Sequence, residues 1–166
     1  MEVISHYEVG GLTPPVEMVR EIAAAVKIPL RVMVRETEPF EVRDELEIEK
    51  LCTAAGEFAR LGVNGLVLGF VKDGSQKKVI DHELVARVLA CAPNLKATFH
   101  RAIEELDDTL PAIAELKRHR QIDRILTSGG DEAWNEKVEK FTVWQRAAQP
   151  EIEILVGGGT DAEVIG

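Results

Sequence analysis

Ala97-Thr98-Phe99-His100-Arg101-Ala102 decides the fold, because an apolar stretch ends there in clustered protic side chains. Thr98 and His100 alternate with Ala97 and Phe99, as side chains do on the two faces of a β-strand. Arg101 follows where the strand gives way to a loop. A strand that ends in His and Arg is typical of the sites that α/β proteins build at the carboxyl ends of their strands.

Five further apolar segments resemble this one and are separated by stretches with helical periodicity. The predicted strands are Met1 to Ser5, Leu30 to Arg35, Gly65 to Phe70, Lys96 to His100, Arg124 to Thr127 and Ile152 to Val156. Their starts lie about 25 to 35 residues apart, the length of a strand, a crossover helix and two loops. This rhythm predicts an α/β fold with one parallel sheet, in a single domain over residues 1–166.

The helices expected between these strands carry recognisable ends. Helices are predicted over residues 16–26, 44–61 and 109–116, with another opening at His82 and running toward Cys91. Gly62 suits the left-handed cap after the second helix. Asp107 and Asp108 are the acids expected to cap the helix that begins at Thr109.

Charge and composition exclude several classes of partner. The chain has 29 acidic and 20 basic residues, a formal net charge of −9, which repels nucleic acid phosphates and anionic lipid. Lys117-Arg118-His119-Arg120 is the densest basic run, and it is expected to end a helix and face water. No apolar stretch approaches the roughly 20 residues of a membrane helix. We expect neither a nucleic acid nor a membrane partner.

The two cysteines, Cys52 and Cys91, lie far apart in the sequence and match no CxxC or zinc-ligand spacing. This usage fits a reduced, cytoplasmic protein. Cys52 falls on the apolar face of its predicted helix, so it is expected to be a small core residue.

The candidate site residues are those that end the predicted strands, because ligands of parallel α/β folds bind at the carboxyl ends. The set comprises Glu2, Ser5, Arg31, Arg35, Thr98, His100, Arg101, Thr127, Ser128, Gly157, Gly158 and Gly159. In an enzyme, Arg35 and Arg101 would hold an anion and His100 would be the acid or base, with Glu2 as its partner.

Two glycine-containing loops favour a small anionic ligand. Thr127 and Ser128 precede one of them, and Gly157 to Gly159 form the other, where backbone N–H groups could bind phosphate or carboxylate. Structural alternatives remain. Arg31 or Arg35 could neutralise Glu2 or Glu153 in a buried layer, and His100 could be a satisfied core histidine.

With these segments in hand, the chain resembles the CutC family of copper homeostasis proteins. The matching segments are Gly10-Gly11-Leu12-Thr13-Pro14, Arg31-Val32-Met33-Val34-Arg35, Gly65-Leu66-Val67-Leu68-Gly69, Thr98-Phe99-His100-Arg101-Ala102, Arg124-Ile125-Leu126-Thr127-Ser128-Gly129 and Gly157-Gly158-Gly159. The resemblance implies a TIM-type barrel, a cytoplasmic location and a role in handling copper.

The chain departs from that family pattern in ways that bear on copper and on the barrel. Met1-Glu2-Val3-Ile4 replaces the usual Ile-Glu-Leu-Cys strand, which keeps the acid and loses the thiol that copper(I) would favour. The family's first strand and helix and its last strand have no counterpart. Six strands predict an incomplete barrel, since a closed one needs eight. Its edges would be completed by further chain or by another subunit, so we expect a homo-oligomer.

Three functions remain open at this stage. The first is a CutC-like protein of copper homeostasis with a polar pocket at the strand ends, in which copper is a ligand by resemblance only. The second is a barrel enzyme that acts on a small anionic metabolite through His100 and its neighbours. The third is a degenerate paralogue without a ligand.

Overall fold

A parallel sheet of six strands forms the centre of the computed structural model, which describes residues 1–42 and 44–158. In spatial order the strands are β1 (Glu2–Val3), β2 (Arg31–Met33), β3 (Gly65–Leu68), β6 (Lys96–Phe99), β7 (Ile122–Thr127) and β8 (Glu153–Val156). All neighbours are parallel, and β1 and β8 are the two edges. The predicted six-stranded α/β sheet is confirmed.

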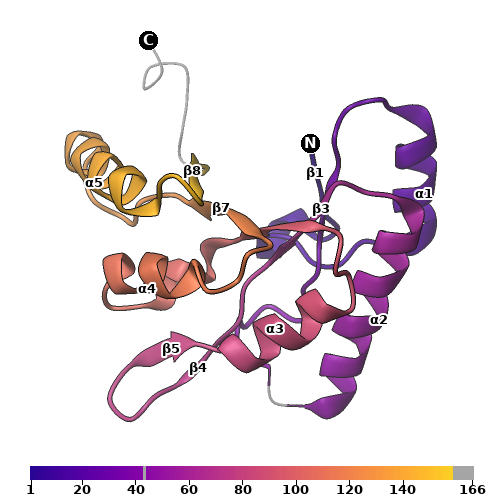
Figure 1. Ribbon diagram of the computed structural model, residues 1–166, viewed down its shortest axis with the longest axis horizontal. Helices are drawn as coiled ribbons and strands as arrows, with labels where there is room; N and C mark the ends of the chain where they lie inside the picture. Colours follow the sequence, from indigo (N-terminus) through magenta and orange to yellow (C-terminus); the bar gives the residue numbers. More distant parts are fainter. Residues whose placement is uncertain (43, 159–166) are drawn as a thin grey trace.

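The connecting helices lie in an arc along the outside of the sheet (Figure 1). They are α1 (Val16–Ala25), α2 (Glu45–Leu61), α3 (His82–Ala90), α4 (Thr109–Leu116) and α5 (Trp134–Ala148). Their apolar faces and the strands share one core, with Phe58 and Leu66 fully buried in it. None of the helices in the described ranges has the length and apolar content that a membrane span requires.

Aspartates fix where three of these helices begin. Asp44, Asp81 and Asp108 each accept a hydrogen bond from a backbone N–H in the first turn. Such a cap satisfies a donor that the helix itself leaves unpaired. Gly62 ends α2 with φ 75°, the left-handed conformation expected for it.

A small hairpin was not predicted. β4 (Val71–Asp73) and β5 (Lys78–Ile80) pair antiparallel, around a turn in which the N–H of Gly74 donates to the Lys77 carbonyl. Three-residue strands give too few positions to establish a period of two, so the sequence does not reveal them. The hairpin matters because it carries Lys78 to the site described below.

Arg31 makes an ion pair across the sheet with Asp123 of β7. Its guanidinium donates to both carboxylate oxygens at 2.6 and 2.8 Å and to Thr98 Oγ1 at 3.0 Å. The side chain passes Gly65, where a Cβ would lie 3.3 Å from Arg31 Cγ. The hydrogen-bonded partner of Arg31 is therefore Asp123 and not Glu2 or Glu153, the alternatives left open by the sequence. The charge of Arg31 still acts on Glu2: burial raises the pKa of Glu2, and Arg31 offsets part of that rise. Glu153 instead accepts from Arg124, at 3.0 Å.

Candidate functional site

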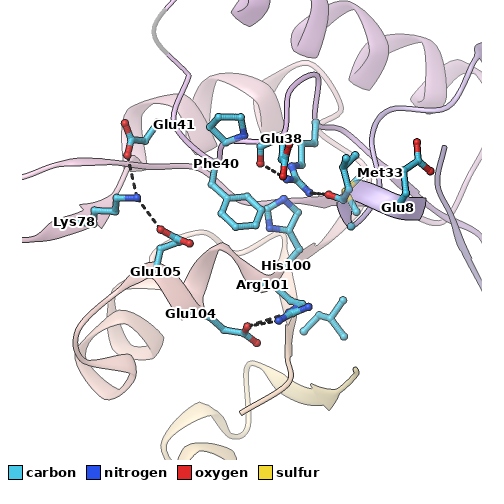
Figure 2. Close-up of a pocket in the computed structure, with 15 residues that line it drawn as sticks. Glu8, Met33, Glu38, Phe40, Glu41, Lys78, His100, Arg101, Glu104 and Glu105 are labelled. Carbon is cyan, nitrogen blue, oxygen red and sulfur yellow. Dashed lines mark hydrogen bonds and ion pairs between the residues drawn. The ribbon is translucent and has the colours of Figure 1, made fainter. Parts of the chain in front are cut away.

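A pocket of about 480 Å³ lies at the carboxyl ends of β2 and β6 (Figure 2). Most of its lining comes from three stretches: the turn around Val9, the loop that follows β2, and the 3₁₀ helix η2 (Arg101–Glu105) directly after β6. Lys78 of β5 and Leu126 of β7 complete it. His100, Arg101 and Arg35 all line it. The structure therefore brings three of the predicted site residues together.

His100 is 2% exposed and is held in one tautomer by the chain that follows it. Its Nδ1 accepts a hydrogen bond from the backbone N–H of Ala102 at 3.2 Å. Burial first, and then the positive charge of Arg35, lower the pKa of His100 to about 3. The ring is therefore neutral near pH 7, and because Nδ1 is the acceptor, Nε2 carries the proton. Within residues 1–42 and 44–158, Nε2 is buried with no hydrogen-bond partner.

Close neighbours restrict the His100 ring. The ring of Phe40 lies with its centroid 5.0 Å from that of His100. A Cβ at Gly69 would lie 2.6 Å from Nδ1, so a larger residue at Gly69 would displace the ring. His100 is thus a preorganised neutral donor rather than a mobile acid or base.

Arg35 holds two loops together instead of offering its charge to a ligand. It is 6% exposed, and its guanidinium donates to the carbonyls of Val9 (3.3 Å), Gly11 (3.2 Å), Thr37 (3.0 Å) and Glu38. Four of its five N–H groups are thereby used. The predicted anion-holding role of Arg35 is wrong, because its donors are committed to backbone oxygens.

An internal carboxylate occupies the predicted anion site. Glu104 accepts from Thr127 Oγ1 at 2.9 Å and from the Ser128 N–H at 2.5 Å, while Arg101 donates to its other oxygen at 3.0 and 2.9 Å. Burial alone would raise the pKa of Glu104, but the hydrogen bonds from Arg101, Ser128 and Thr127 outweigh it and lower that pKa. Thr127 and Ser128 therefore donate to an anion that is part of the same chain.

The second glycine loop lies beside this cluster. The N–H of Gly157 donates to the Thr127 carbonyl at 2.9 Å. Gly158 has φ 96°, and a Cβ there would lie 3.6 Å from Ser128 Cβ and 4.0 Å from the Arg101 guanidinium. Gly159 lies outside the described residues. The N–H of Gly157 is therefore bonded within the chain, and Gly158 lies next to Ser128 and Arg101.

Glu2 lies at the opposite end of the strands. It is in register with Arg31, Gly65 and Lys96, and Lys96 precedes His100 by four residues. At about 3.3 Å per residue the separation along the strand is about 13 Å. Glu2 does not contact His100, so the predicted pairing of the two is wrong.

The sequence analysis missed the acidic character of the pocket. Lys78 lies between Glu41 (3.1 Å) and Glu105 (2.7 Å), as Figure 2 shows. Five glutamates line the pocket against three basic residues, and each of those bases already has an acceptor in the protein. These carboxylates come from a loop and from two short 3₁₀ helices, where no periodicity singles them out. The pocket therefore suits a neutral or cationic polar ligand better than an anion.

The pocket is a poor fit for copper(I). Met33 supplies the one sulfur atom in its lining, and Cys52 and Cys91 lie elsewhere, on α2 and at the end of α3. In the described part of the chain, no three His, Cys, Asp or Glu side chains gather in a way that could hold a metal ion. Copper(I) prefers soft sulfur ligands, and this pocket offers mainly oxygen and one imidazole.

The parallel sheet, its outer helices and the site at the strand ends define an incomplete α/β barrel of the TIM type. The sialic acid aldolase of Ruminococcus gnavus shares this fold, with a TM-score of 0.60 over 85% of this chain and 44% of the aldolase, at 12% identity. CutC from Streptococcus agalactiae is far more similar, with a TM-score of 0.86 and 27% identity over 98% of this chain and 79% of that one. The CutC family profile matches residues 1–166, and the chain belongs to the CutC family.

Curated relatives agree with this assignment. The family protein CutC of Xylella fastidiosa (strain Temecula1) is 31% identical over 165 residues, 98% of this chain and 59% of the relative. The human copper homeostasis protein cutC homolog is 31% identical over 160 residues, 96% of this chain and 57% of the relative. The chain thus spans less than two thirds of the length of these two relatives. The predicted resemblance to CutC is confirmed.

Replacing Glu104 with alanine is expected to turn the internal anion site into an open one. The variant removes the carboxylate that accepts from the Ser128 N–H, the Thr127 hydroxyl and Arg101. This loss should lower the free energy of unfolding by about 2 to 3 kcal/mol at pH 7. Added formate should restore part of that loss by occupying the vacated position. Thermal melting with and without formate measures both effects. The control is Glu151→Ala, which removes an exposed carboxylate paired with Lys117 and should show no formate effect. An equal formate shift in the parent chain would contradict the conclusion that Glu104 occupies the anion site.

Proposed function

We propose that this chain acts in copper homeostasis in the cytoplasm, and that it binds a small polar ligand in the pocket around His100. Its membership of the CutC family and the name of its human relative, a copper homeostasis protein, support the copper role. The observation that carries the pocket assignment is the buried, unpartnered Nε2–H of His100. A buried donor without an acceptor costs about 1 to 3 kcal/mol, which a ligand with an acceptor atom would recover.

The ligand that this pocket favours is neutral or cationic, with an oxygen or nitrogen acceptor for His100. Copper(I) itself is not the best occupant of the pocket, because Met33 supplies a single sulfur atom there. In its copper role, the chain would then bind an organic ligand in the pocket or bind copper at another site.

A barrel enzyme acting on a small anionic metabolite is the second candidate. Arg101 favours it, because its side chain is 54% exposed at the pocket wall and could exchange Glu104 for a substrate anion. The neutral His100 would then be a hydrogen-bond donor to the substrate.

Thermal shifts with a panel of polyols, amines, phosphates and carboxylates separate these functions. The same measurements are repeated on the His100→Ala and Arg101→Ala variants. The first function predicts hits among neutral or cationic compounds that His100→Ala abolishes. Anionic hits that Arg101→Ala abolishes would favour the enzyme, and no hit at all would favour a degenerate paralogue.

The copper role is tested by growth on copper of a bacterial strain whose own CutC-family gene has been deleted. Expression of this chain should alter the growth of that strain relative to the empty vector.

We also propose that the chain self-associates through its open sheet edges. Among the residues that the structure describes, β1 and β8 each have a neighbouring strand on one side only, and Val156 on β8 is 38% exposed. Unpaired edge strands present free N–H and C=O groups to another chain. Light scattering should give at least twice the mass of one chain, and a mass equal to one chain with a cooperative melt would contradict the proposal.

A further inference from the structure

Lys78 lines the pocket and lies between two carboxylates that come from other segments (Figure 2). Its Nζ is 3.1 Å from Glu41 Oε1 and 2.7 Å from Glu105 Oε2. Glu41 belongs to the loop after β2, Glu105 is the last residue of η2, and Lys78 begins β5. Hydrogen bonds from Lys78 to Glu105 and then to Glu41 raise the pKa of Lys78, so this position favours a charged ammonium group over a neutral amine.

The ammonium group of Lys78 is a replaceable occupant of this position. It is bound by side chains, whereas the guanidinium of Arg35 is bound by backbone carbonyls. The side chain is 34% exposed, and its flexible four-carbon stem allows the ammonium group to turn into water while the backbone stays in place. An ion pair that water reaches contributes little to stability. The ammonium group of a ligand can therefore take the place of Lys78.

His100 supplies a second, independent requirement in the same pocket. Its Nε2–H is buried and, within residues 1–42 and 44–158, has no acceptor. The carboxylate position is close to it: the ring of Phe40 lies 5.0 Å from that of His100, Glu41 follows Phe40 in the chain, and Glu105 follows His100 by five residues. A single small ligand can therefore offer an acceptor to His100 and a cation to the two carboxylates.

We propose that Glu41 and Glu105 bind the ammonium group of a primary amine whose neutral oxygen accepts the Nε2–H of His100, and that Lys78 fills the ammonium position in the free protein. The proposal rests on the ligand pocket proposed above and names the chemical class of its ligand. The oxygen belongs to a hydroxyl or carbonyl group and not to a carboxylate, because the glutamates of the lining outnumber its basic residues. Amino alcohols are the simplest compounds of this class.

The first experiment compares terminal amino alcohols of increasing chain length with diols of the same length, by calorimetric titration of the whole chain. Lys78→Ala should bind the amino alcohols about 5- to 10-fold more tightly than the parent does, because the two carboxylates no longer hold a competing ammonium group. The affinity for diols should not change. Adding Glu105→Gln to Lys78→Ala should abolish the gain.

Lys72→Ala is the matched control. Lys72 lies on the same hairpin and pairs with Asp81 at 3.1 Å, and neither residue lines the pocket. This variant should bind amino alcohols as the parent does. Amino alcohol affinity that is the same in Lys78→Ala as in the parent would overturn the ammonium site.

Methylammonium is a second probe, because it can fill the vacated position without reaching His100. It should raise the melting temperature of Lys78→Ala above the value in an equal concentration of tetramethylammonium, which has no N–H donor. The parent and Lys72→Ala should melt alike in the two salts. Equal melting temperatures of Lys78→Ala in the two salts would also overturn the site. Circular dichroism confirms that each variant is folded.

The results distinguish this site from the pocket itself. If His100→Ala abolishes the binding of diols and amino alcohols while Lys78→Ala leaves both affinities unchanged, the ammonium site fails and the pocket stands. If methylammonium stabilises Lys78→Ala but His100→Ala binds amino alcohols as the parent does, the two carboxylates bind an ammonium group and the proposed role of His100 fails. The absence of binding in the parent and in every variant would overturn both.

Discussion

Arg35→Met is expected to lower the free energy of unfolding by about 3 to 5 kcal/mol, although it changes no residue of the sheet core. Arg35 joins the turn at Val9 and Gly11 to the loop at Thr37 and Glu38 through four donated hydrogen bonds. Methionine has a similar length but no donor, so the carbonyls in this buried junction lose their partner. Urea denaturation at pH 7 measures the loss.

Two variants test the reason for this effect. Arg35→Lys keeps the charge but not the planar fork, so it should recover only a minor part of the loss. Arg20→Met removes an exposed arginine on α1 and should leave the stability nearly unchanged. An Arg35→Met variant as stable as the parent would show that the two loops hold together without the guanidinium.

The buried, neutral state of His100 should make the protein lose stability in mild acid. The pKa is about 3 in the folded protein against an ordinary value of 6.5. As the pH falls below 6.5, the unfolded chain binds a proton at this position and the folded chain does not. The free energy of unfolding should therefore fall by up to about 1.4 kcal/mol per pH unit between pH 6.5 and about 3.

His100→Gln isolates this contribution, because glutamine keeps a donor but does not titrate. The pH slope of the parent minus that of the variant should be about 1.4 kcal/mol per unit between pH 6 and 5. His119, whose pKa is also lowered by burial and by the charge of His82, is present in both proteins and cancels in the difference. Identical slopes would mean that His100 titrates normally in the folded state.

The strands of the parallel sheet and the helices from α1 to α4 follow from the sequence, because each depends on residues close together in the chain. The apolar runs near Gly65 and Ala97 are long enough to establish strands. Asp44 and Asp108 are capping residues whose partners lie two residues away. Local chemistry of this kind needs no knowledge of the tertiary fold.

The partners of the polar side chains do not follow from the sequence, because they are set by register and by loop packing. Arg31 reaches Asp123 over two intervening strands, and Glu104 reaches Ser128 from a separate loop. The sequence analysis placed His100 and the donor loops at the correct end of the sheet. It could not show that Arg35 and the donors at Thr127 and Ser128 are committed to acceptors within the chain.

The proposed site is built around a neutral His100 whose Nε2–H is available to a ligand. Nitrogen-15 NMR of the histidine-labelled chain between pH 7.5 and 4.5, assigned with His100→Gln, tests this protonation state most directly. The His100 ring should remain neutral throughout, with the proton on Nε2 and none on Nδ1. A His100 that titrates near pH 6.5, or that carries its proton on Nδ1, would contradict it.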